Sequence, residues 1–149
     1  MNIDEILSQD AVLPDLKAKT NIEVFVELAA PLHALRPELH SVDVVSILID
    51  REKLGSTAVG EGIAIPHGRV SGLSQACLAV GRSIKGIDFF APDGQPCHIF
   101  FLILMMEHGA GQQLRLLAQI ARRAKEPVFR RKIDMAANAS QLWQAIIAP

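Results

Sequence analysis

Apolar positions in the first third of the chain recur with the spacing of helices. Thr20-Asn21-Ile22-Glu23 is a capping-box pattern, and the apolar residues that follow repeat every three or four positions (Ile22, Phe25, Val26 and Ala29). This spacing predicts a helix over residues 21–33. Ser41 can cap a second helix, which ends near Gly55 and carries three apolar residues on one face (Val44, Val45 and Leu48).

The middle of the chain changes to short apolar or β-branched runs bounded by Gly, Pro and Asp. These runs predict strands at Gly62–Ile65, Cys77–Arg82 and Pro96–Leu104. Residues His98–Leu104 show no polar alternation, which predicts a central strand covered on both faces.

The helical period returns after Gly109. One helix is marked by Leu114, Leu117, Ala118 and Ala121. Two shorter helices are predicted near Val128–Met135 and Ser140–Ile147. Helices on either side of a strand-rich middle predict an α/β fold in layers, although the pattern does not decide between parallel and mixed strand pairing.

Length and composition narrow the class of protein. With 149 residues and no linker or repeat, we expect one domain over residues 1–149. Half of the residues are hydrophobic and 21% are charged, which argues against disorder. The net charge of −1 lacks the basic excess of a general nucleic-acid or anionic-membrane binder.

The location of the protein is expected to be cytoplasmic. The first ten residues, MNIDEILSQD, have no basic or apolar region typical of a signal peptide. The longest apolar stretch, Ile99–Met106, is much shorter than the roughly 20 residues that span a bilayer. Cys77 and Cys97 lie in apolar runs without a C-x-x-C pattern, so we expect reduced core thiols.

The segment from Arg51 to Gly68 is the most unusual in the sequence. It contains a Gly/Ser/Thr loop and ends in Pro66-His67-Gly68, so His67 is expected at a strand end on a stiff backbone, with room beside its ring. One interpretation is a turn with an incidental histidine. The other is a nucleophile that attacks an anionic group, close to hydroxyls, free N–H groups and an arginine.

The same segment closely resembles the active-site signature of the fructose/mannitol-type enzyme IIA domains of the bacterial phosphotransferase system. In that family a Gly/Thr loop leads to Gly-Ile-Ala-Ile-Pro-His-Gly, which stands here at residues 62–68. The segment from Val80 to Pro96 and the strand that follows look most like the nitrogen-regulatory branch. The resemblance implies a mixed sheet flanked by helices on both faces.

The resemblance also implies the roles of individual residues. His67 would accept the phosphoryl group, and Arg51 would contact its oxygens as a fixed positive charge. Ser56, Thr57 and Gly68 would belong to the phosphoryl-binding loop, where the two hydroxyls could support either the anion or the loop itself. No metal or organic cofactor is implied.

Gln113 is a departure from the family pattern. Relatives commonly have a second histidine near the start of the helix after the long strand, and Gln113 stands at that position. Its spacing from Leu117 and Ile120 predicts that it faces inward. A glutamine can orient His67 or donate to a phosphoryl oxygen, but it cannot titrate. Another possibility is that His108, five residues upstream, takes the place of the second histidine in space.

The resemblance implies a phosphohistidine carrier with no turnover of small molecules of its own. An HPr-like protein would donate the phosphoryl group to His67, and the change in charge would regulate kinases or transporters. Two alternatives stay open: a sugar-specific component that passes the group to a IIB domain, and a binding-only regulator with little phosphotransfer. No nucleic-acid partner or membrane insertion is expected.

Overall fold

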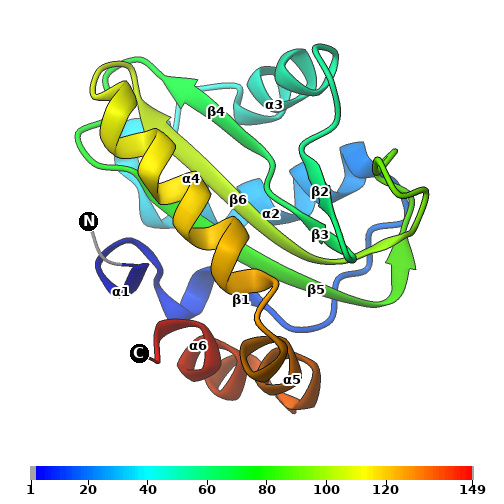
Figure 1. Cartoon of the computed structure of the whole chain (residues 1–149). Coiled ribbons are helices and arrows are strands. Elements are labelled where there is room, and N and C mark those ends of the chain that lie inside the picture. The colour runs from blue at the N-terminus through cyan, green and yellow to red at the C-terminus, as the bar shows by residue number, and fades with distance from the viewer. Residues whose placement is uncertain (1–2, 149) are drawn as a thin grey trace.

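A six-stranded mixed sheet forms the centre of the computed structural model, which describes residues 3–148 (Figure 1). The strands are β1 (Val12–Leu13), β2 (Ala58–Gly60), β3 (Ile63–Ala64), β4 (His67–Val70), β5 (Cys77–Ile87) and β6 (Cys97–Met106). Their order is β1-β5-β6-β3-β2, and β4 also pairs with β6. The β5–β6 and β2–β3 pairs are antiparallel and the other pairs are parallel. The mixed sheet implied by the resemblance is therefore confirmed.

Helices cover both faces of this sheet. Figure 1 shows α4 (Ala110–Ala124) crossing in front of the strands and α2 (Asn21–Leu35) behind them. The other helices are α1 (Ile3–Ile6), α3 (Val44–Glu52), α5 (Pro127–Met135), α6 (Ala139–Ile147) and the 3-10 turns η1 (Gln9–Ala11) and η2 (Pro37–Leu39). The α/β layered fold is confirmed. Between residues 3 and 148, no helix combines the length and the apolar character that a membrane span requires.

The strand β6 is the buried centre of the sheet, as its sequence predicted. Residues 99–104 are each at most 1% exposed, because β5 and the β3–β4 edge flank the strand and helices cover both faces. Cys77 of β5 and Cys97 of β6 are buried free thiols. Burial raises the pKa of each thiol to about 11, so both are unreactive core residues at neutral pH.

Side-chain caps begin two of the predicted helices. The Thr20 hydroxyl accepts the Glu23 N–H at the start of α2, as predicted. The prediction that Ser41 caps the next helix is wrong: Asp43 is the cap, and its carboxylate accepts the Ser46 N–H at 3.0 Å. The chain is still turning at Val42, whose N–H donates to Leu39, so the helix begins later than a cap at Ser41 would place it.

Residue spacing did not identify which face of α2 is buried. Ile22 and Val26 are 47% and 54% exposed, whereas the buried residues are Val24, Phe25, Leu28, Ala29 and Leu32. The helix is apolar on most of its circumference, so periodicity alone cannot select the face that packs on the sheet.

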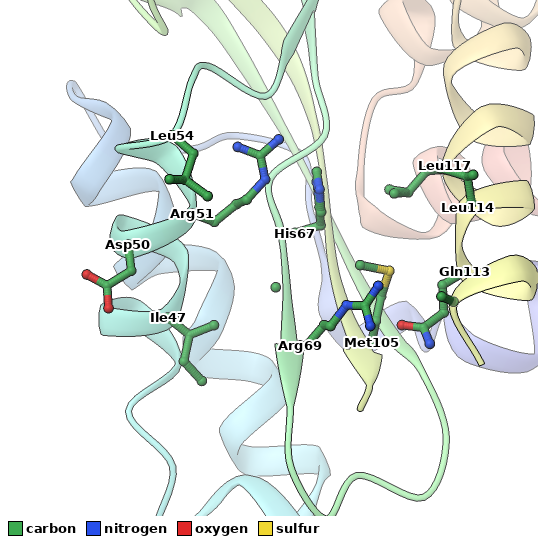
Figure 2. Close-up of a pocket in the computed structure, with 12 residues that line it drawn as sticks. Ile47, Asp50, Arg51, Leu54, His67, Arg69, Met105, Gln113, Leu114 and Leu117 are labelled. Atoms are coloured by element: carbon green, nitrogen blue, oxygen red, sulfur yellow. The ribbon is translucent and has the colours of Figure 1, made fainter. Parts of the chain in front are cut away.

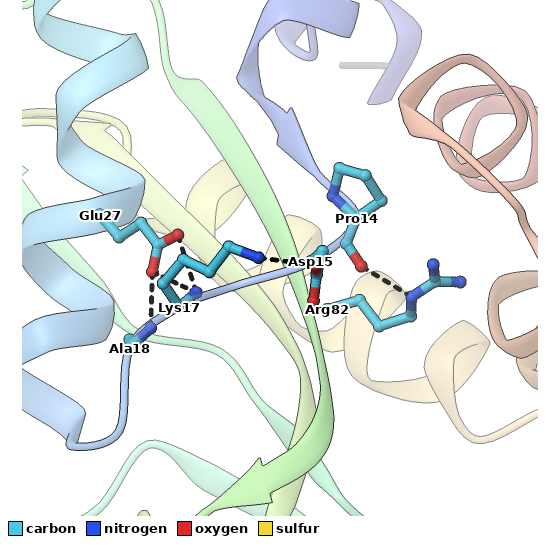
Figure 3. Close-up of polar contacts among 6 residues, drawn as sticks. All are labelled: Pro14, Asp15, Lys17, Ala18, Glu27 and Arg82. Carbon is cyan, nitrogen blue, oxygen red and sulfur yellow. Dashed lines mark hydrogen bonds and ion pairs between the residues drawn. The ribbon is translucent and has the colours of Figure 1, made fainter.

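Residues 14–18 are fastened between α2 and β5 by two charged side chains (Figure 3). The Glu27 carboxylate accepts the N–H groups of Lys17 and Ala18 at 2.8–3.0 Å. Arg82 of β5 donates from Nε to the Pro14 carbonyl at 3.0 Å. These bonds add to the backbone bond from the Leu16 N–H to the Arg82 carbonyl, which continues the contact with β5 beyond the short strand β1.

Arg82 also connects the end of α5 to the sheet. Its Nη1 donates to the carbonyls of Ile133 and Ala136, each at 2.7 Å, although the side chain is buried. Carbonyls at a helix C-terminus have no partner within the helix and carry partial negative charge. The buried guanidinium therefore satisfies acceptors from two separate segments of the chain.

Replacing Arg82 with methionine should destabilise the protein by about 2–4 kcal/mol, because buried carbonyls lose their donors. Arg82→Lys should lower the free energy of unfolding by less, since an ammonium group keeps part of the hydrogen bonding. Urea unfolding measures both changes, with Arg131→Met at an exposed position of α5 as the control. A midpoint for Arg82→Met equal to that of the control would contradict this assignment.

Candidate functional site

His67 stands where the edge of the sheet is interrupted. Both β3 and β4 pair in parallel with β6, at Ile63↔Ile99 and His67↔Ile103. Ile65 and Pro66 separate the two strands, and Pro66 has no N–H to donate to a ladder. His67 therefore lies at a strand end, as predicted, but it is the first residue of β4 and does not follow directly on the strand predicted at residues 62–65.

The ring of His67 is oriented by its own backbone neighbourhood. Its Nδ1 lies 2.8 Å from the carbonyl of Ile65, and a carbonyl only accepts, so Nδ1 carries the hydrogen. In the neutral ring the lone pair is then on Nε2. This geometry provides a half-buried imidazole with one defined nucleophilic atom.

The environment of His67 favours its neutral form. Burial lowers the pKa of the ring, and the positive charge of Arg51 lowers it further, while the hydrogen bond to Ile65 acts in the opposite direction. The net direction is downward from the ordinary value of 6.5. The lone pair on Nε2 is therefore available throughout the neutral pH range.

A cavity of about 500 Å³ opens in front of His67, between α3 and α4. Figure 2 shows Arg51 reaching from α3 towards the ring, with Gln113 and two leucines of α4 on the opposite side. Arg51 Nη1 donates to the Gly55 carbonyl at 3.0 Å, which holds the guanidinium next to the loop that follows α3. The sequence-predicted residues His67, Arg51, Gly68 and Gln113 thus line one cavity.

Gly68 allows α3 to approach β4. A Cβ on this residue would lie 2.6 Å from Cγ2 of Ile47, much closer than van der Waals contact. The sequence predicted that this glycine leaves room beside the imidazole of His67. In the structure α3 fills the space instead. Because α3 also carries Arg51, this close packing sets how near the guanidinium comes to His67.

The hydroxyls of Ser56 and Thr57 are both engaged within the loop. Ser56 Oγ donates to the Phe89 carbonyl at 2.6 Å and accepts the Ala58 N–H. Buried Thr57 donates its hydroxyl and its N–H to the Glu52 carboxylate. Burial raises the pKa of Glu52, and the Thr57 bonds oppose that change. These bonds shape the loop between α3 and β2.

Gln113 is 3% exposed, so the prediction that it faces inward is confirmed. Its Nε2 donates to the His108 carbonyl at 2.7 Å, whereas its Oε1 is buried without a hydrogen-bond partner in the described residues. His108 itself is exposed and is absent from the cavity wall. The structure therefore gives no support to His108 as the substitute for a second histidine.

Arg69 is a cavity residue that the sequence analysis missed. It lies two residues beyond His67 on β4, and alternate residues of a strand point to the same side. Figure 2 shows its guanidinium beside Met105, on the far side of His67 from Arg51. The alternation along residues 67–70 would have identified it if β4 had been predicted.

The apolar residues that predicted helix α4 line a second, apolar groove. Leu114, Leu117, Ala118 and Ala121 face a hollow of about 320 Å³ that begins at His67 and continues along β2. The buried side chains of α4 are instead Gln113, Leu116, Ile120 and Ala124. One face of this helix packs on the sheet, and an adjacent apolar face flanks the site.

Residues 5–148 match the family described as "Phosphoenolpyruvate-dependent sugar phosphotransferase system, EIIA 2". The chain belongs to this family. It is therefore a phosphotransfer component of that system, as the resemblance implied. The nitrogen regulatory protein of Bradyrhizobium diazoefficiens is 34% identical over 149 residues, which cover 100% of this chain and 97% of that protein.

Solved structures agree with this family assignment. The nitrogen regulatory protein IIA-Ntr of Neisseria meningitidis has a TM-score of 0.86 and 32% identity, over 97% of this chain and 98% of its own. The enzyme IIA for mannitol of Escherichia coli, solved in complex with its phosphorylated IIB, has a TM-score of 0.75 over 96% and 98% of the two chains. At 15% identity the second likeness concerns the fold alone.

The ring of His67 should titrate below 6.5, because burial and Arg51 both disfavour the imidazolium. As the pH falls through this lowered pKa, Nε2 gains a proton and loses its lone pair. Nitrogen-15 NMR measures the midpoint. In Arg51→Gln the midpoint should move upwards, and an unchanged or lower value would show that Arg51 does not act on this ring.

Proposed function

We propose that this protein is a phosphohistidine carrier in which Nε2 of His67 accepts a phosphoryl group from an HPr-like protein. The observation that supports this best is the bond from Nδ1 to Ile65, which leaves Nε2 as the free nitrogen beside an arginine-lined cavity. Family membership supports the reaction class, and the residue assignment is our inference.

The proposed step exchanges one P–N bond for another. The lone pair on Nε2 forms a bond to phosphorus, the P–N bond of the donor phosphohistidine breaks, and its electron pair leaves with the donor imidazole. His67 keeps the hydrogen on Nδ1 and so becomes a phosphoimidazolium, whose positive charge the Ile65 carbonyl stabilises. Transfer to an acceptor is the reverse exchange.

The neighbouring residues take separate parts in this proposal. Arg51 contacts the phosphoryl oxygens, where charge spreads in the transition state. Ser56 and Thr57 hold the loop, since their hydroxyls are already engaged. The apolar groove beside α4 provides contact area for the donor protein close to its phosphohistidine.

We assign the carrier to regulation rather than sugar transport. The nitrogen regulatory protein of Bradyrhizobium diazoefficiens matches over nearly its whole length, and IIA-Ntr is the nearer of the two structures described above. The phosphoryl group would add roughly two negative charges at the cavity, which changes the surface that kinases or transporters meet. Transfer to a IIB domain is the alternative.

Incubation with enzyme I, HPr and phosphoenolpyruvate should place an acid-labile phosphoryl group on His67. His67→Ala should abolish the label, and His40→Ala, at an exposed histidine, should retain it. Phosphorus-31 NMR and mass spectrometry measure the label. An unlabelled wild type, under conditions that label a known relative, would favour the binding-only alternative, and rapid transfer to a fructose- or mannitol-type IIB would favour sugar transport.

Gln113→Ala should slow phosphoryl transfer roughly fivefold, the effect of losing a buried hydrogen bond of about 1 kcal/mol that positions the site. The neighbouring exposed residue provides the control, Gln112→Ala. The rate of phosphoryl transfer is measured by stopping the reaction at successive times, and thermal unfolding shows whether the variant stays folded. Equal transfer rates and equal phospho-His67 lifetimes for the two variants would show that Gln113 does not position the site.

A further inference from the structure

A second arginine lies on the same side of β4 as His67. Arg69 follows at the position i+2, and the residues between and beyond, Gly68 and Val70, are buried on the opposite side. Arg69 itself is exposed and lines the cavity. The strand therefore presents a nucleophilic ring and a guanidinium to the same space, with Arg51 on the opposite wall (Figure 2).

The guanidinium of Arg69 is weakly engaged. Its hydrogen bond in residues 3–148 is from Nη1 to the Glu107 carbonyl at 3.3 Å, and no carboxylate of this part of the chain pairs with it. The acidic residue of the cavity wall, Asp50, pairs with Lys53 and points away from the site in Figure 2. A cation without an anion beside a cavity is suited to an anionic ligand.

Gln113 supplies an acceptor on the Arg69 side of the cavity. Its Oε1 is buried and lacks a hydrogen-bond partner among residues 3–148. Figure 2 shows this oxygen directed towards Met105 and Arg69. A buried acceptor without a donor is unfavourable, and an N–H group of the Arg69 guanidinium would satisfy it.

The number of phosphoryl oxygens gives a reason for a second arginine. The three oxygens share nearly two negative charges at neutral pH, and one guanidinium binds at most two of them. Arg51 and Arg69 line the same cavity on opposite sides of His67, so together they can contact all three oxygens. Arginine is suited to this task because its planar donors fit two oxygens at once.

We infer that Arg69 is a second phosphoryl-binding arginine. When His67 carries a phosphoryl group, the Arg69 guanidinium breaks its bond to the Glu107 carbonyl and donates to the phosphoryl oxygens. Gln113 Oε1 then accepts another N–H group of the same guanidinium. This inference rests on the proposed function, because the ligand is the group that His67 carries. The resting bond to Glu107 keeps the guanidinium beside the cavity before transfer. The contrary possibility is a solvated cation at an exposed strand position.

The test measures the phosphoryl group itself, without a docking partner. The wild type, Arg69→Gln and Arg69→Lys are phosphorylated through enzyme I and HPr, or with phosphoramidate if docking is impaired, and are then purified. Phosphorus-31 NMR follows the second ionisation of the phosphoryl group with pH. Arg131→Gln, in α5 at the other end of the molecule, is the matched control (Figure 1).

A neighbouring cation favours the dianion, so Arg69→Gln should raise the phosphoryl pKa by roughly one unit. Arg69→Lys should keep most of the wild-type value, and Arg131→Gln should keep all of it. Transfer from HPr should fall roughly tenfold in Arg69→Gln, with circular dichroism confirming the fold. Superimposable titrations of Arg69→Gln and wild type would overturn the inference about Arg69 alone, whereas failure to label His67 in the wild type would overturn the proposed function.

Discussion

The hydrogen bond from His67 Nδ1 to the Ile65 carbonyl is the interaction on which the site depends. It exists because the strand edge is interrupted at Pro66. The carbonyl two residues before the histidine is therefore free to accept a hydrogen bond from the ring. The bond selects the tautomer and the orientation together. Without it, either nitrogen could carry the hydrogen, and the position of the nucleophilic lone pair would not be defined.

The buried strand β6 makes this interruption possible without loss of order. It pairs with β3 before the break and with β4 after it, and the Pro66 carbonyl still accepts the Ile103 N–H between them. On the other side of the site, the contact of Gly68 with Ile47 brings α3 close to β4. Rigid packing of the sheet and this helix thus places Arg51 and His67 relative to each other.

The sequence was sufficient for the features that depend on local pattern. Helix α2, the uniformly apolar strand β6 and the motif ending at His67 each have a strong signal within a few residues. The four-residue strand β4 has no such signal, because pairing with β6 defines it, and Arg69 was missed with it. The apolar residues of α4 predicted the helix, but their spacing alone does not show that Leu114 and Leu117 line a groove beside the site.

Burial of the imidazole has opposite effects on the two states of the proposed carrier. It keeps the free ring neutral and nucleophilic, but it also disfavours the positive charge of the phosphoimidazolium. In the proposed phosphorylated state the Ile65 carbonyl and the attached dianion would offset that cost, and the arginines would in turn stabilise the dianion. A carrier has to receive its group from one protein and release it to another, so neither state can be strongly favoured. Partial burial, with opposing charges around one ring, meets that requirement better than full burial or full exposure.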